Sequence, residues 1–85
     1  LMNAVHGKSF RITRFLVENK VNPNYSSNYG YTPLNYAVNS EDYQITKYLL
    51  DKGANIHATN FAGKTALHVA AEKGNIDLVK LLIDR

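Results

Sequence analysis

The sequence predicts an all-α fold, a solenoid of stacked antiparallel helix pairs with projecting β-turn loops. The first observation is that similar residues recur at an offset of 33 positions along the 85-residue chain, as Leu1, Leu34 and Leu67 illustrate. The second is that residues suited to start a helix fall at the same phase of successive copies, and amphipathic segments follow them. A period of about 20 to 50 residues is typical of arrays whose units bury their apolar faces only against neighbouring units.

The first helix of each copy is expected to begin after a threonine. Thr32 and Pro33 form a strong helix start, because the threonine hydroxyl accepts a free backbone N–H and proline suits the first helical position. Thr65 repeats this start without a proline. We predict first helices over residues 33–40 and 66–73. Small or β-branched residues on them allow a neighbouring helix to approach closely, namely Ala37, Val38, Ala70 and Ala71.

A second helix is predicted after each of three N-cap residues at one phase, Ser9, Asp42 and Asn75. The segments 10–16, 43–49 and 76–82 each carry apolar residues at positions i, i+2, i+5 and i+6. This pattern predicts amphipathic helices that form an outer wall. The polar side chains expected on the outward face are Arg11, Arg14, Gln44, Lys47, Asp77 and Lys80.

The segments between the helix pairs are predicted to be extended loops with tight turns. Lys52 and Gly53 are expected to end the second helix of the middle copy, because glycine readily adopts the left-handed conformation of a C-cap. Residues 21–31 and 54–64 are rich in Asn, Ser, Gly and Pro. We expect their turns near Gly30 and Gly63. One repeat therefore reads as loop, helix, short turn and helix.

Composition limits the classes of function. The chain contains no cysteine, which excludes a disulfide scaffold, a thiolate metal site and a thiol nucleophile. No run approaches the roughly 18 apolar residues of a membrane helix, and no charged-then-apolar signal segment opens the chain. We therefore expect a soluble protein of the cytosol or nucleus that has no membrane partner.

The net charge of +3 is mild, and its excess lies in residues 1–20. A nucleic-acid-binding protein usually has a denser basic stripe, so we interpret these basic residues as a solvated helix face and expect no nucleic-acid partner. Nucleic-acid binding through the first helix pair stays an alternative, which a salt titration of affinity tests. The basic residues concerned are Lys8, Arg11, Arg14 and Lys20, set against Glu18.

No group of residues predicts catalysis, a cofactor or a metal. His6, His57 and His68 are the only residues that suggest acid–base or metal chemistry. His57 and His68 have no carboxylate or second ligand at a recognised spacing, so neither a zinc site nor an acid–base constellation is indicated. The glycines follow turns and form no phosphate-binding string. We expect no enzyme activity and no cofactor for this segment.

Six tyrosines concentrate in the middle of the chain, and five of them fall into two groups. Helix phase places Tyr36, Tyr43 and Tyr48 at or near the packing seam, which favours a role in the core. Tyr29 and Tyr31 instead flank a glycine at a predicted loop tip. Exposed aromatic side chains at such tips are typical anchors of protein interfaces.

Two stretches of the chain share one motif, Gly30-Tyr31-Thr32-Pro33-Leu34-Asn35-Tyr36-Ala37 and Gly63-Lys64-Thr65-Ala66-Leu67-His68-Val69-Ala70-Ala71, and between them lies Lys52-Gly53-Ala54-Asn55-Ile56. The first two strongly resemble the ankyrin repeat, and the third is similar to that family's inter-repeat signature. The resemblance covers the whole chain as a partial unit (1–29), a complete unit (30–62) and a partial unit (63–85), and the family's histidine survives only as His68. Since the motif is interrupted at Leu1 and at Arg85, we expect the segment to be cut from a longer array, with apolar side chains exposed at its ends. The side chains expected there are Leu1, Val5, Leu78 and Leu82.

The resemblance also implies roles for individual residues. It implies that His68 stabilises its turn by a hydrogen bond to nearby backbone, and that the family's helix-closing glycine is replaced by Lys8 and Glu41 before it reappears as Gly74. Asn24 and His57 occupy the phase at which similar repeats are hydroxylated by an asparaginyl hydroxylase. We treat this modification as a hypothesis.

Partners of similar proteins bind the loop tips and the inner face of the first helices. The resemblance therefore implies a protein–protein interaction module with flanking ankyrin repeats in the parent chain. The alternative is a substrate-recruiting segment of a larger enzyme such as a ubiquitin ligase or a kinase, or of a microbial effector. The candidate partner-binding residues are His6, Gly7, Asn28, Tyr29, Tyr31, Asn39, Ser40, Phe61, Ala62, Lys64, Glu72 and Lys73.

Overall fold

A computed structural model describes residues 10–19, 22, 24, 32–60 and 62–85. Within these residues the chain forms five α-helices and no strand, which confirms the all-α prediction. The helices are α2 (Phe10–Glu18), α3 (Pro33–Asn39), α4 (Tyr43–Asp51), α5 (Ala66–Lys73) and α6 (Ile76–Ile83).

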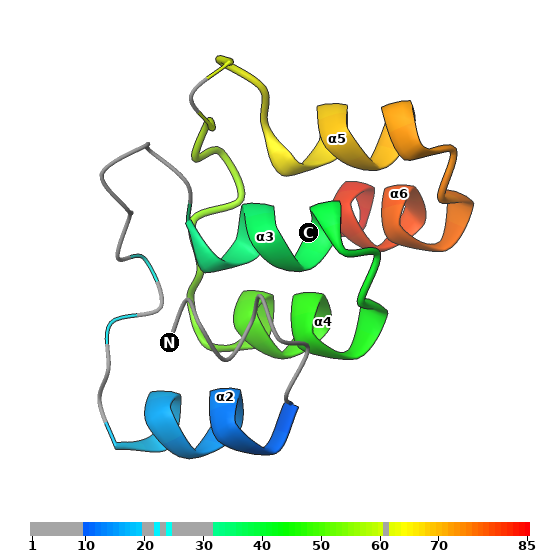
Figure 1. Cartoon of the computed structure of the whole chain (residues 1–85). Helices are drawn as coiled ribbons and strands as arrows, with labels where there is room; N and C mark the ends of the chain where they lie inside the picture. The colour runs from blue at the N-terminus through cyan, green and yellow to red at the C-terminus, as the bar shows by residue number, and fades with distance from the viewer. Residues whose placement is uncertain (1–9, 20–21, 23, 25–31, 61) are drawn as a thin grey trace.

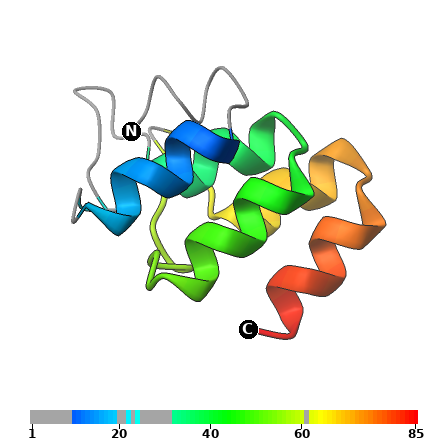
Figure 2. The same ribbon diagram turned by 90° about the horizontal axis from the view of Figure 1, so that it is seen from below.

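The helices lie in two layers. One layer contains α3 and α5, which pack against each other, and the other contains α2, α4 and α6 (Figure 1). Seen from below, α2, α4 and α6 run side by side (Figure 2). Each of the pairs α3/α4 and α5/α6 is antiparallel, so the loop that joins the pairs projects at one side of the stack. This is the stacked helix-pair arrangement that the 33-residue period predicts.

The first helices start at the predicted threonines. The Thr32 hydroxyl accepts a hydrogen bond from the backbone N–H of Asn35 at 3.3 Å, with Pro33 in the first turn. Thr65 caps α5 in the same way. Helix α3 ends at Asn39, one residue earlier than predicted, and Ser40 is its C-cap. The bounds of α5 are those expected from the sequence.

The second helices begin after the predicted N-caps wherever the structure describes them. The side chain of Asp42 accepts from the N–H of Ile45 at 2.9 Å, and that of Asn75 accepts from the N–H of Leu78 at 3.1 Å. Ser9 lies outside the described residues. The helices continue one or two residues beyond the predicted segments, because hydrogen bonds of the last turn extend past the final apolar position. Gly53, with φ of 93°, closes α4 as expected.

The core lies between the two layers and is centred on α3, α4, α5 and α6. It consists of aliphatic side chains from both layers, and the six polar side chains assigned to the outer wall are exposed as predicted. Burial therefore follows the amphipathic pattern of the inner helix faces. The buried apolar residues are Leu34, Ala37, Val38, Ile45, Leu49, Ala54, Ala66, Val69, Ala70, Leu78, Leu81 and Leu82.

Two predictions about apolar side chains are wrong. Tyr43 is exposed on the outer wall rather than buried at the seam, whereas Tyr36 and Tyr48 are half-buried. Leu78 and Leu82 are buried instead of exposed, because they point from α6 into the core between the layers. Leu1 and Val5 lie outside the described residues.

Polar contacts also join neighbouring repeats. The side chain of Asn24 accepts from the N–H of Asn55 at 2.6 Å and donates to the carbonyl of Gly53 at 3.1 Å. Asn75 donates to the carboxylate of Glu41 at 3.2 Å. Each bond connects residues 29 to 34 positions apart, so these contacts link one helix pair or loop to the next.

Candidate functional site

A hollow of about 430 Å³ opens where the end of α3, the length of α5 and the tip of the loop before α5 come together. We call it the inner hollow. Its floor includes the buried side chain of Val69, and its rim is polar. The residues that line it are Asn39, Asn60, Ala62, Lys64, Val69, Glu72 and Lys73.

The loop tip is held by one asparagine. The Asn60 side-chain oxygen accepts hydrogen bonds from the N–H groups of Ala62 at 2.9 Å and Lys64 at 3.1 Å. The Asn60 backbone N–H donates to the Lys64 carbonyl at 2.8 Å, and the Gly63 N–H donates to the Asn60 carbonyl at 2.9 Å. Gly63 has φ of 76°, which glycine tolerates best. The tip is therefore a defined turn, as the sequence predicts for this loop.

An ion pair connects the tip to α5. The Nζ of Lys64 lies 2.7 Å from Oε2 of Glu72, and both side chains are about half exposed. An exposed pair of this kind contributes about 0–1 kcal/mol to stability, so its main effect is to orient the two side chains. Lys73 is exposed and makes no ion pair with any of the described residues. The hollow therefore presents both signs of charge beside the Asn39 amide.

The structure brings together five of the predicted partner-binding residues, which are Asn39, Ala62, Lys64, Glu72 and Lys73. Ser40 does not line the inner hollow. It is half-buried and its N–H donates to the carbonyl of Tyr36 at 2.9 Å. The other predicted residues lie outside the described part of the chain, namely His6, Gly7, Asn28, Tyr29, Tyr31 and Phe61.

Sequence reasoning missed two residues of the hollow, Asn60 and Val69. Asn60 precedes a glycine by three residues, a spacing suited to a side chain that caps its own turn, and this signal was available in the sequence. In the sequence, Val69 has the pattern of an ordinary core residue. Its contribution to the surface hollow depends on how the loop folds over α5, which the sequence pattern does not show.

The histidine and asparagine at the start of the first helices behave differently. Nδ1 of His68 accepts from the Thr65 N–H at 3.2 Å, which completes a capping box and confirms the turn-stabilising role implied by the resemblance. Asn35 occupies the same phase but is buried, and its side-chain amide has no hydrogen-bond partner among the described residues. The replacement of histidine by asparagine therefore removes the capping box in the middle copy.

Three residues of the outer helices α2 and α4 have shifted pKa values. Hydrogen bonds from Arg85 and Lys47 lower the pKa of Asp51. Partial burial raises the pKa of the Tyr48 hydroxyl, and the neighbouring Glu18 raises the pKa of Arg14. These shifts follow from structural ion pairs and packing.

The described residues bring together no group of three or more His, Cys, Asp or Glu side chains that could bind a metal ion. In the same part of the chain, the helices are too short or too polar to cross a membrane. Asn24 and His57 carry no feature that tests the hydroxylation hypothesis, which stays a prediction.

Comparison with known families identifies the repeat. A family model described as ankyrin repeats (3 copies) matches residues 1–60, and a model of a single ankyrin repeat matches residues 62–85. A search of curated proteins found no match. The helix pairs, the capped starts of the first helices and the tip turn agree with these matches. The chain belongs to the ankyrin repeat family.

Proposed function

We propose that the inner hollow and the adjoining loop tip bind a protein partner. Ankyrin repeats act as protein–protein interaction modules, which supports this class of function for the chain. The observation that carries the proposed position is the meeting of residues from the end of α3, the tip turn and α5 at one hollow. Such a concave polar surface with a buried apolar floor suits the side chains of a partner.

Binding at this surface relies on rigidity. The turn held by Asn60 and the pair between Lys64 and Glu72 keep the rim in place before the partner arrives. A partner then loses less free energy to the ordering of the module, because few side chains have to be immobilised. Lys73 and Asn39 offer a cation and an amide that the described residues leave unpaired, so both are available to the partner.

A substitution at the hollow tests this proposal. Ala62 is exposed on the rim, so Ala62→Arg fills part of the hollow without disturbing the core. We expect it to weaken the affinity for a partner first captured with the unaltered chain by at least about tenfold, measured by calorimetry. Lys80→Glu, on the outer wall, serves as the control and should leave the affinity unchanged. Equal losses in the two variants, or none in Ala62→Arg, would contradict the site.

The loop-tip aromatics belong to the same proposal. We expect the combined substitution of Tyr29, Tyr31 and Phe61 by alanine to weaken partner binding further, because aromatic side chains provide large contact areas at small entropic cost. A substrate-recruiting role within a larger enzyme would use the same surface. We also propose that the protein works in the cytosol or nucleus and that flanking ankyrin repeats pack on the outer faces of the stack.

A further inference from the structure

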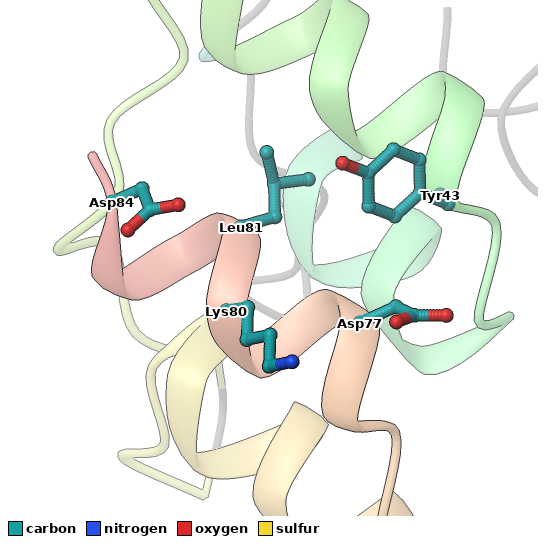
Figure 3. Close-up of a pocket in the computed structure, with 5 residues that line it drawn as sticks. All are labelled: Tyr43, Asp77, Lys80, Leu81 and Asp84. Atoms are coloured by element: carbon teal, nitrogen blue, oxygen red, sulfur yellow. The ribbon is translucent and has the colours of Figure 1, made fainter.

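Two hollows on the outer wall repeat each other at the 33-residue offset. The first outer hollow is lined by residues of α2 and α4 and has a volume of about 260 Å³. The second outer hollow is lined by residues of α4 and α6 and has a volume of about 290 Å³ (Figure 3). Tyr43 lines both, so the two hollows adjoin. Five positions of the first recur in the second, in the pairs Phe10 and Tyr43, Gln44 and Asp77, Lys47 and Lys80, Tyr48 and Leu81, and Asp51 and Asp84.

Tyr43 is exposed although α4 has a neighbouring helix on each side. The residue is 46% exposed, whereas α4 packs on α2 and on α6 (Figure 2). In the second outer hollow its hydroxyl points towards Leu81 (Figure 3). Stacking of the helix pairs therefore leaves this ring open to a partner, and an exposed ring offers a large contact area at small entropic cost.

The first outer hollow is aromatic, and its charges are already paired. Three aromatic rings line it, and that of Phe10 packs edge-on against that of Tyr48, with centroids 5.3 Å apart. The Nζ of Lys47 lies 3.2 Å from Oδ2 of Asp51, and the same carboxylate accepts a hydrogen bond from Arg85. An apolar side chain of a partner suits this hollow, because it meets rings and no free charge.

The second outer hollow is acidic instead. Asp77 takes the place of Gln44, and neither Asp77 nor Asp84 forms an ion pair with a described residue. Lys80 is the cation among the lining residues, and it is also unpaired within the described part of the chain. Two carboxylates and one ammonium leave an excess of one negative charge. A cationic side chain suits this hollow, because it meets unpaired carboxylates beside an exposed ring.

The two hollows are separated by about one helix spacing. Packed neighbouring helices lie about 8–10 Å apart, measured between their axes. A polyproline II segment has three residues per turn and rises about 3.1 Å per residue, so side chains at positions i and i+3 point to one side about 9 Å apart. A segment of this conformation that crosses α4 places one side chain in each hollow.

We propose that the outer wall binds a polyproline II segment of a second partner protein, with an arginine in the second outer hollow and an apolar side chain three positions away in the first. The guanidinium stacks on the ring of Tyr43 and donates to the carboxylate of Asp77, a combination that suits arginine better than lysine. The net charge of the chain is +3, so the attraction of arginine comes from these local carboxylates and not from the whole molecule.

The outer wall is separate from the proposed partner site. No residue that lines either outer hollow also lines the inner hollow. Two partners can therefore bind one molecule together, and loss of one interaction leaves the other intact. A substitution of Lys80 changes the second outer hollow alone.

NMR titration of the 85-residue chain with two capped tetrapeptides tests the proposal. Arg-Pro-Pro-Leu and Leu-Pro-Pro-Arg present the same side chains in opposite chain directions. We expect at least one of them to bind with a Kd on the order of 1 mM, because four residues cover little surface, and to shift the resonances of Tyr43 and Asp77. Citrulline in place of arginine keeps the shape and removes the charge, so it should weaken binding by at least about fivefold.

Variants of the chain locate the contact. Tyr43→Ala should weaken binding by at least about tenfold, because the ring lines both hollows, and Asp77→Asn by about fivefold. Lys80→Gln should instead strengthen binding by about twofold, since it removes a cation that repels arginine. Glu18→Gln is the matched control, because it removes an exposed carboxylate of α2 that lines neither hollow, and it should bind like the unaltered chain.

Circular dichroism checks that each variant folds. The proposal is overturned if neither peptide shifts the resonances of the outer wall at about 10 mM, or if the shifts lie at the inner hollow. It is also overturned if the citrulline peptides bind as well as the arginine peptides, or if Tyr43→Ala and Asp77→Asn both keep the affinity of the unaltered chain.

Discussion

Glu41, in the turn between α3 and α4, adopts a backbone conformation that most residues avoid. Its φ is 56°, and Gly74, at the same position of the next repeat, has φ of 68°. The left-handed region costs a residue with a Cβ about 1–2 kcal/mol, whereas glycine enters it freely. The hydrogen bond from Asn75 to the Glu41 carboxylate offsets part of this cost.

Exchanging the residue types at this turn should change stability in opposite directions. We expect Glu41→Gly to raise the free energy of unfolding by about 0.5 kcal/mol, because relief of strain exceeds the lost hydrogen bond and the added flexibility of the unfolded chain. Gly74→Ala should lower it by about 1 kcal/mol. A Cβ at Gly74 meets no other atom within 4 Å, so that loss reports the backbone conformation alone. Urea denaturation measures both, and changes of the same sign would contradict the argument.

The hydrogen bonds of the Asp51 carboxylate make the free energy of unfolding depend on pH. Hydrogen bonds from Arg85 and Lys47 lower its pKa in the folded protein below the ordinary value of 3.8. Because the folded pKa is lower than the unfolded one, the stabilisation is fully present above pH 3.8 and is lost as the pH falls through the folded pKa. NMR titration should show the shifted carboxyl. In Asp51→Asn, the free energy of unfolding should fall less than in the unaltered chain as the pH is lowered from about 5 to about 2.

At the scale of the elements, one asparagine side chain joins two loops. Asn24 forms two hydrogen bonds to the backbone of the following loop, at Gly53 and Asn55. His57 has the same phase one repeat later, and its side chain makes no hydrogen bond to a described residue. One side chain thus links the chain around Asn24 to the loop that follows α4.

Removal of this connection should be measurable. Asn24→Ala loses two hydrogen bonds, each with a net contribution of about 0.5–1.5 kcal/mol, so we expect unfolding free energy to fall by roughly 1–2 kcal/mol. His57→Ala is the matched control and should change it by less than about 0.5 kcal/mol. Hydrogen exchange of the Asn55 amide gives a local readout, since this amide should exchange faster in Asn24→Ala only. Equal effects of the two substitutions would show that the connection contributes nothing.

At the scale of the whole molecule, stability comes from contacts between repeats. The core is shared by the α3/α4 and α5/α6 pairs, and helices of each layer pack on their neighbours in the same layer. No single helix pair of such an array buries its apolar residues alone. The middle repeat is therefore the one whose side chains are covered on both sides.

The same leucine-to-alanine substitution should lower stability by very different amounts at a buried and at an exposed position. Leu49 is fully buried, so Leu49→Ala should lower the unfolding free energy by about 2–5 kcal/mol, a large part of the total for a chain of this size. Leu67→Ala, at a side chain of α5 that is 39% exposed, should cost less than about 1 kcal/mol. Thermal and urea denaturation measure the difference. Similar losses for the two variants would contradict a core shared between repeats.

Most of the fold was predictable without the structure. Helix starts at Thr32, Asp42 and Asn75 depend on hydrogen bonds that reach three residues along the chain, so short sequence patterns are sufficient to locate them. The 33-residue period in turn predicts that the units stack. The candidate surface was partly predictable as well, because the resemblance named five residues that line the inner hollow.

Packing between repeats decides which apolar side chains of the repeat pattern are buried and which are exposed. Leu34 and Leu67 are identical in sequence position, and only the presence of α5 over α3 makes one buried and the other exposed. The exposure of Tyr43 and the hollow around Val69 also depend on how the elements around them pack. A local pattern determines which face of a helix is apolar, but burial requires another element to remove that face from water.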